Sequence, residues 1–200
     1  MLVRAMTKSS DQKSLHSLLK EATAVLHGEV DLKLSKNLNG RRDGYPVFLR
    51  IMASAILPLE DLLTAKNAAA FVTDWPLRSR SAELKADLAA LGLEPYVEAI
   101  ELPDFGEAHA LGIMYVLEGS RLGGRVILSR LAGGSKALPT RFLSHGHGRL
   151  WQSFLSQLEM SDAAQRHTEK LVEGATFAFR RFETITSLGV WSVLEARDQF

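Results

Sequence analysis

Residues 112–130, GIMYVLEGSRLGGRVILSR, combine a helical apolar pattern with internal glycines, and this combination constrains the fold more than any other stretch. Apolar and small side chains recur here at steps of three and four, as on one face of a helix: Ile113, Val116, Leu117, Ser120, Gly123, Gly124 and Ile127. Each glycine inside a helix costs about 1 kcal/mol relative to alanine, so Gly119, Gly123 and Gly124 together cost about 3 kcal/mol. Because Gly119 and Gly123 lie four positions apart, they leave a bare strip on one helix face. The strip predicts either a flat ligand or a close helix crossing, and glycine spacing alone favours the crossing.

The rest of the chain also has helical periods, and no stretch alternates with the period of two that is typical of a strand. The predicted helices span 10–34, 45–58, 82–91, 112–131, 150–158 and 162–188. Ser10 or Asp11 is expected to cap the first helix, and Pro58 to kink or end the second. Residues 65–81, 94–106 and 190–200 are not assigned. We therefore predict an all-α protein with a flexible leader at residues 1–9 and a single domain at 10–200.

The composition excludes several classes of function. The chain has 200 residues and a net charge of +1, which does not indicate nucleic acid or an anionic membrane surface as a partner. It has no cysteine, which excludes disulfides, thiol nucleophiles and thiolate-bound iron, and which fits a cytoplasmic location. The most apolar stretch, residues 47–59, is interrupted by Arg50 and Pro58 and is too short to span a bilayer.

Most of the six histidines lack the neighbours that a metal site needs. No histidine has a glutamate three residues before it, as ferritin-like di-iron sites require, and HExxH is absent. His145 and His147 alternate with glycines, which favours a surface loop over a metal site.

His27 differs from the others because of the residues on its helix face. Asp31 lies one turn later, where a carboxylate can orient a metal-bound imidazole. Lys20 lies seven residues earlier, almost in line along the helix, where a cation can hold the anionic edge of a ligand. His16 is nearly in phase as well, so geometry alone does not choose between the two histidines. A packing or surface role for either histidine stays open at this point.

Two motifs together resemble the bacterial haem oxygenase family: LKEATAVLHGEVD (19–31) and YVLEGSRLGG (115–124). Weaker similarity continues, in the family's order, in LKADLAALGLEPY (84–96), GRLWQSF (148–154) and GATFAF (174–179). The resemblance implies a helical bundle in which haem lies between a proximal helix and a kinked, glycine-rich distal helix.

The resemblance also implies roles for individual residues. His27 is the expected axial ligand of the haem iron, with Asp31 as its hydrogen-bonding partner. Lys20 and Tyr115 are expected at the haem propionates, Thr23 against the haem, and Phe177 near the pocket. The expected distal wall is formed by Gly119, Ser120, Gly123 and Gly124, of which the first three act on the reaction. Arg180 or Arg181 is expected at a propionate, with a solvated helix face as the alternative, and Arg121 is expected to face outward.

The implied activity is the oxidation of haem b, which is both substrate and cofactor, by O2 to biliverdin, with release of CO and ferrous iron. A ferredoxin, a flavodoxin-like protein or a reductase would supply electrons, and a bilin-binding photoreceptor is a candidate acceptor of the product. The competing hypotheses are a haem carrier or sensor that does not degrade its ligand, and a helical interaction module without a cofactor. The residues do not identify the cleaved meso carbon.

Overall fold

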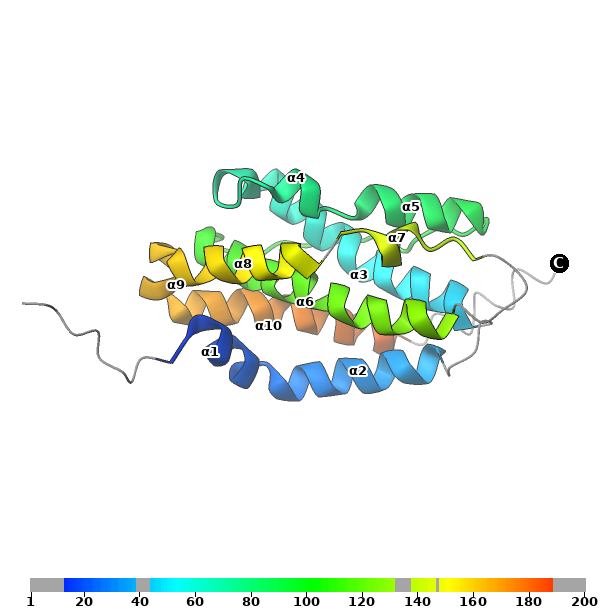
Figure 1. Ribbon diagram of the computed structural model, residues 1–200, viewed down its shortest axis with the longest axis horizontal. Coiled ribbons are helices and arrows are strands. Elements are labelled where there is room, and N and C mark those ends of the chain that lie inside the picture. Colours follow the sequence, from blue (N-terminus) through cyan, green and yellow to red (C-terminus); the bar gives the residue numbers. More distant parts are fainter. Residues whose placement is uncertain (1–12, 39–43, 132–137, 147, 189–200) are drawn as a thin grey trace, which may run out of the picture.

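The computed structural model describes residues 13–38, 44–131, 138–146 and 148–188, and these residues form helices and no strand (Figure 1). In chain order the elements are α1 (Leu15–Ala22), α2 (Ala24–Leu38), α3 (Tyr45–Ala65), the 3-10 turn η2 (Ala68–Ala70), α4 (Trp75–Arg78), α5 (Ser81–Ala90), α6 (Glu107–Leu131), α7 (Arg141–Ser144), α8 (Gly148–Met160), α9 (Asp162–Arg166) and α10 (Thr168–Ser187). This confirms the prediction of an all-α fold. The predicted leader, Ser10, Asp11, His147, the glycines at 133–134 and residues 190–200 lie outside the described residues.

The first predicted helix is two helices, α1 and α2, which meet at Thr23. The Thr23 hydroxyl is buried and donates a hydrogen bond to the Leu19 carbonyl at 2.8 Å, a contact that bends helices. The helix also begins later than predicted, because Ser14 is the N-cap and its hydroxyl accepts from the Ser17 N–H. The expectation that Ser10 or Asp11 caps this helix was therefore wrong.

Pro58 was expected to kink or to end its helix, and α3 continues past it to Ala65, so the second of these alternatives was wrong. A proline has no N–H for the carbonyl four residues earlier, here that of Ser54. Arg181 of α10 donates to the Ser54 carbonyl instead, from Nε at 3.2 Å and from Nη2 at 2.9 Å. The hydrogen bond that Pro58 cannot make is thus replaced by a residue distant in sequence.

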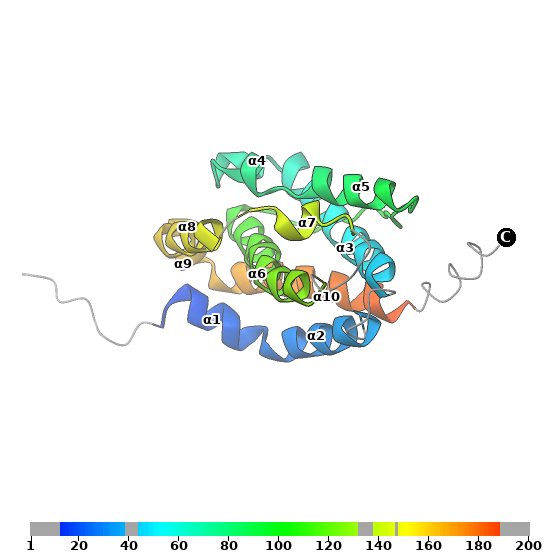
Figure 2. The ribbon, with the colours of Figure 1, turned by 45° about the vertical axis from the view of Figure 1, so that its right-hand side comes forward.

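Helices α6 and α10 form the closest helix packing of the core, and glycine makes it possible (Figure 2). A Cβ added to Gly112 would collide with the Leu171 carbonyl oxygen, and one added to Gly174 would collide with the His109 backbone. The close crossing that glycine spacing suggested for Gly119 and Gly123 therefore occurs earlier in α6.

The arrangement of the helices leaves α1 and α2 along one edge of the molecule and α4 and α5 along the opposite edge (Figures 1 and 2). Helix α10 packs on α2, α3 and α6, and α3 in turn packs on α5. Among the described helices, none combines the length and the apolar content that crossing a membrane requires.

Candidate functional site

A cavity of about 760 Å³ lies between α1 and α2 on one side and α6 on the other. Its walls are mainly apolar and aromatic. Helix α2 contributes Val30 and Leu34, and helices α3, α7, α8 and α10 contribute Phe48, Met52, Phe142, Leu143, Trp151, Phe179 and Phe182. Cavities of roughly 300–1,000 Å³ with such walls are typical binding sites for small molecules and cofactors. Most of the residues predicted for the haem site line this cavity: Lys20, Thr23, His27, Asp31, Tyr115, Gly119, Ser120, Gly123 and Gly124.

His27 presents its imidazole to the cavity from α2. Its side chain is 61% exposed, and its Nε2 lies 3.7 Å from Oδ2 of Asp31, the partner predicted from the sequence. The imidazole also meets the Phe179 ring of α10 edge to face, with 5.6 Å between ring centroids. An accessible imidazole beside a carboxylate is the arrangement that metal-bound histidines usually have.

The glycine strip of α6 borders the cavity. A Cβ added to Gly123 would meet no atom within 4 Å, and one added to Gly119 would meet only the Trp151 ring, at 3.9 Å. Gly124 is more tightly packed, since its added Cβ would lie 3.3 Å from Leu143 Cδ2. At Gly119 and Gly123 the structure therefore favours space for a ligand over a helix crossing. Helix α6 is uninterrupted through these glycines.

Ser120, the polar residue of this wall, is held by a buried arginine that the sequence analysis did not identify. Its hydroxyl donates to the Leu117 carbonyl at 2.7 Å and accepts from Arg80 Nη2 at 2.8 Å. Arg80 also donates to the Leu117 carbonyl at 2.9 Å and stacks on the Phe142 ring, 4.9 Å from its centroid. Burial, followed by the nearby charge of Arg121, lowers the pKa of Arg80 to about 10, so the guanidinium stays charged near neutral pH.

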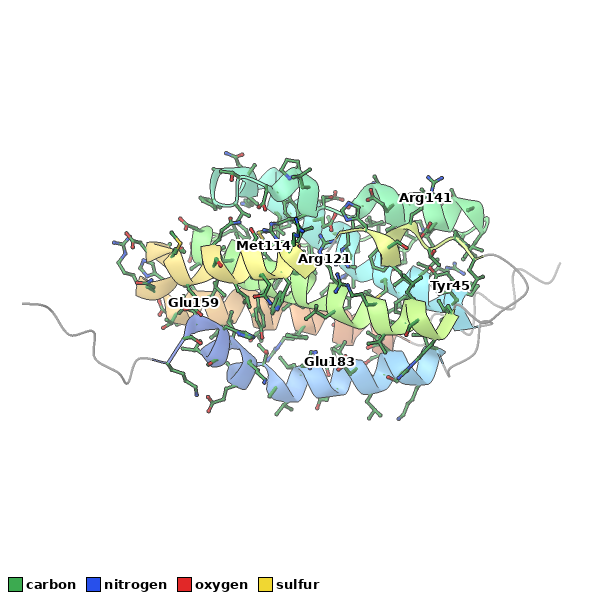
Figure 3. The ribbon with its side chains drawn as sticks, in the orientation of Figure 1. Tyr45, Met114, Arg121, Arg141, Glu159 and Glu183 are labelled. Atoms are coloured by element: carbon green, nitrogen blue, oxygen red, sulfur yellow. The ribbon has the colours of Figure 1, made fainter. Side chains whose placement is uncertain are left out.

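Arg121 is buried, and the expectation that it faces outward was wrong (Figure 3). Its Nε donates to Glu118 at 3.0 Å, its Nη2 donates to the Arg78 carbonyl, and its Nη1 donates to the His145 carbonyl at 3.2 Å. Glu118 also lies 3.1 Å from Arg78 Nη1. Neighbouring helix positions are only about 100° apart, so residues 120 and 121 can both be inside a bundle. The i,i+3 spacing of Glu118 and Arg121 was the available sequence signal for this pair.

Lys20, Thr23 and Tyr115 come together at the end of the cavity formed by α1 and α6. Burial raises the pKa of the Tyr115 phenol, so it remains a neutral hydrogen-bond donor. The tyrosine ring lies 6.1 Å from the His16 ring and 5.7 Å from the Trp151 ring, measured between centroids. This end therefore carries a cation and a neutral donor, as an anionic ligand edge requires.

The structure does not bring the residues predicted from α10 to the cavity. Phe177 packs partly buried against the core, and the aromatic residues of α10 that line the cavity are Phe179 and Phe182. Arg180 is exposed and does not line the cavity. Arg181 is engaged with the Ser54 carbonyl and with Glu98 at 3.2 Å.

The cavity fits the ligand expected from the sequence. It has the volume and apolar walls for a flat macrocycle, an accessible imidazole on one wall, a side-chain-free strip on the facing helix and a cation at one end. Within the described residues, no three His, Cys, Asp or Glu side chains gather into a metal-binding cluster.

Comparison with known proteins gives one consistent answer. A family model described as Heme oxygenase matches residues 13–187. A heme oxygenase of Xanthomonas campestris is 31% identical over 146 residues, which covers 71% of this chain and 88% of that protein. Heme oxygenase PigA of Pseudomonas aeruginosa is 28% identical over 156 residues, covering 74% and 78% of the two chains. The NO- and CO-bound heme oxygenase of Neisseria meningitidis has a similar fold, with a TM-score of 0.73 at 22% identity over 88% of this chain and 91% of that one.

Proposed function

Since this chain belongs to the haem oxygenase family and is an oxidoreductase that degrades haem, we propose that it converts haem b to biliverdin. The reaction uses O2 and electrons from another protein, and it releases CO and ferrous iron. The observation that carries the proposal is the position of His27 and the open glycine strip on the two sides of one cavity. Bound haem supplies the redox-active iron and is itself the molecule that is oxidised.

In this proposal His27 would hold the haem iron. A neutral imidazole has one nitrogen for the metal and one N–H for a hydrogen-bond acceptor, and Asp31 supplies that acceptor. Because Nε2 is the nitrogen nearer Asp31 here, ligation through Nε2 requires the imidazole to turn. The side chain is 61% exposed, and its ring contact is with Phe179, which such a turn would change.

Ser120 organises water on the distal side. A hydroxyl has one donor and two acceptor lone pairs. The donor is used by the Leu117 carbonyl and one lone pair by Arg80, so the second lone pair is left to accept a hydrogen bond from water in the cavity. Arg80 acts through Ser120 as a positioning residue, because it holds the hydroxyl in this orientation. Gly119 and Gly123 keep the space beside it clear.

Lys20 and Tyr115 bind the haem propionates, and Thr23 closes the wall between Lys20 and His27. The ammonium supplies charge and the phenol supplies a neutral hydrogen bond, which suits a carboxylate in a partly buried site. Arg180 and Arg181 are not required at this edge.

The electron donor is an acidic protein that docks beside the cavity. From 119 to 158 the chain has no Asp or Glu and six basic residues: Arg121, Arg125, Arg130, Lys136, Arg141 and Arg149. Leu122, Val126 and Arg130 line the cavity and are exposed, so a partner on this face approaches the haem edge.

A cytoplasmic location and a bilin-binding protein as product acceptor stay predictions.

Purified protein mixed with haemin, with ascorbate under oxygen and catalase present, tests the proposal. Loss of the haem band and growth of a biliverdin band are expected, whereas haem that persists intact would support a carrier or sensor.

His27→Ala is expected to lose the axial-ligand spectrum and turnover. It should keep its helix content, since the removed side chain is mostly exposed. His167→Ala, at an exposed histidine between α9 and α10, is the control. A normal haem spectrum in His27→Ala would contradict the assignment.

A further inference from the structure

The imidazole of His16 lies at the end of the cavity that holds Lys20, and the mechanism described above does not use it. His16 precedes Lys20 by four residues on α1, so the two side chains project from the same helix face. Both line the cavity together with Tyr115. A role for His16 in orienting the substrate of this site rests on the proposed function.

Helix α8 fixes the position of His16 through two of its residues, Glu159 and Trp151. The Glu159 carboxylate of α8 accepts hydrogen bonds from the backbone N–H groups of Leu15 at 3.1 Å and His16 at 2.9 Å (Figure 3). This long-range cap joins the end of α8 to the first turn of α1. The imidazole meets the Trp151 ring edge-on, with 5.7 Å between centroids. His16 is therefore held in place before any ligand binds.

The donors at this end have no acceptor among the described residues. Across the described ranges, the structure gives no hydrogen bond or ion pair to the ring nitrogens of His16 or to the Lys20 ammonium. A hydrogen-bond donor that is held in place and has no acceptor in the protein is suited to donate to an acceptor atom of a ligand. The acidic residue that lines the cavity, Asp31, lies on α2 beyond His27, so carboxylates are disfavoured at that side of the iron ligand. Arg130, near the end of α6, also lines the cavity and is the competing cation.

We propose that His16 binds one haem propionate while Lys20 binds the other, with Tyr115 donating between them. The two propionates lie on the same edge of haem, so holding both fixes the rotation of the macrocycle in its plane. That rotation decides which meso carbon faces Gly119 and Gly123. His16 is thus a substrate-binding residue that determines which biliverdin isomer forms.

The test compares haemin with its dimethyl ester, which lacks the carboxylates. His16→Phe keeps an aromatic ring against Trp151 and removes the ring N–H groups. Its affinity for haemin is expected to fall about tenfold, as for the loss of a charge-assisted hydrogen bond, with its affinity for the diester unchanged. Its product is expected to contain additional biliverdin isomers. His16→Gln, which keeps a donor, should recover part of the haemin affinity, and His167→Phe is the surface control.

Equal losses of affinity for haemin and diester would mean that His16 only packs, and would overturn the proposal. The same holds if His16→Phe changes neither affinity. A preferential loss of haemin affinity in Arg130→Gln instead of His16→Phe would place the propionates at the other end. Failure of the unmodified protein to degrade haemin with ascorbate would contradict the proposed function itself, so the two failures are distinguishable.

Discussion

At the scale of single residues, two glycines of α6 have opposite steric surroundings. Gly123 faces open space, whereas Gly112 faces the backbone of α10. Gly123→Leu should not destabilise the fold, and it gains about 1 kcal/mol of helix propensity. It should weaken haemin binding by about tenfold or more, because the new side chain occupies the ligand space. Gly112→Ala should lower the free energy of unfolding by about 1–3 kcal/mol, as expected of overpacking.

Chemical denaturation and haemin titration of both variants separate the two effects. Unchanged haemin affinity in Gly123→Leu would mean that the ligand does not lie against this strip. Unchanged stability in Gly112→Ala would mean that α6 and α10 can move apart at no cost.

His145 should make the stability of the fold sensitive to mild acid. Burial lowers the pKa of His145 below its ordinary value of 6.5; Glu83 opposes the shift, and Arg121 and Arg80 add to it. Because the unfolded chain takes up this proton more readily than the folded one, the contribution to stability is full above about pH 6.5 and is lost as the pH falls toward the folded-state pKa. Melting temperatures between about pH 8 and 5 should fall less in His145→Gln than in the unmodified protein. Parallel pH profiles for the two proteins would contradict this.

At the scale of elements, Arg181 should stabilise α3 through the carbonyl that Pro58 leaves without a donor. Arg181→Met removes both hydrogen bonds to the Ser54 carbonyl and should cost about 1–3 kcal/mol. In a Pro58→Ala background the backbone N–H gained at position 58 can donate to the Ser54 carbonyl, so the cost of Arg181→Met should be smaller by about 1 kcal/mol. A double-mutant cycle by urea unfolding measures this coupling.

The neighbouring residue provides the matched control for that cycle. Arg180 is exposed on the same helix, and Arg180→Met should change the free energy of unfolding by no more than about 0.5 kcal/mol in either background. Additive effects of Pro58→Ala and Arg181→Met would mean that the arginine does not compensate for the proline.

The same elements show what local sequence can predict. Helix type follows from apolar periodicity, which is local, and the all-α prediction was confirmed. The donor to the Ser54 carbonyl is Arg181, which lies 127 positions away, and no pattern within a short stretch of sequence can predict such a partner. The bend at Thr23 was missed because α1 and α2 keep a common apolar period across it.

At the scale of the whole molecule, the two motifs that predicted the site lie on α1–α2 and α6, and the fold places them across one cavity. His27 and the glycines could be predicted because other residues that line the same cavity lie close to them in the sequence. Arg80 could not, since it reaches Ser120 across 40 positions and comes from a segment with no helical pattern. Residues that line the cavity were thus easier to predict than those that hold them in place.

The charge distribution of the whole chain leads to a prediction about electron transfer. Arg125 on α6 and Arg149 on α8 are exposed, and both belong to the stretch from 119 to 158 that has no Asp or Glu. Helices α6, α7 and α8 form the face that is in front in Figure 1. Reversing both charges, Arg125→Glu with Arg149→Glu, should slow haem reduction by an acidic [2Fe–2S] ferredoxin about tenfold at low salt, because steering of an anionic partner is lost. High salt should remove most of the difference. Reduction by ascorbate, which needs no docking, should be unchanged.

Arg166→Glu on α9 is the control, because Arg166 is exposed and lies outside this face. A ferredoxin that reduces all variants equally would mean that the donor docks elsewhere. Binding of the unmodified protein to DNA, lost in the same double variant, would assign the basic face to a nucleic acid instead. A tenfold, salt-sensitive loss with ferredoxin alone would make this face the entry point for electrons, because it joins the rim of the cavity at Leu122 and Val126.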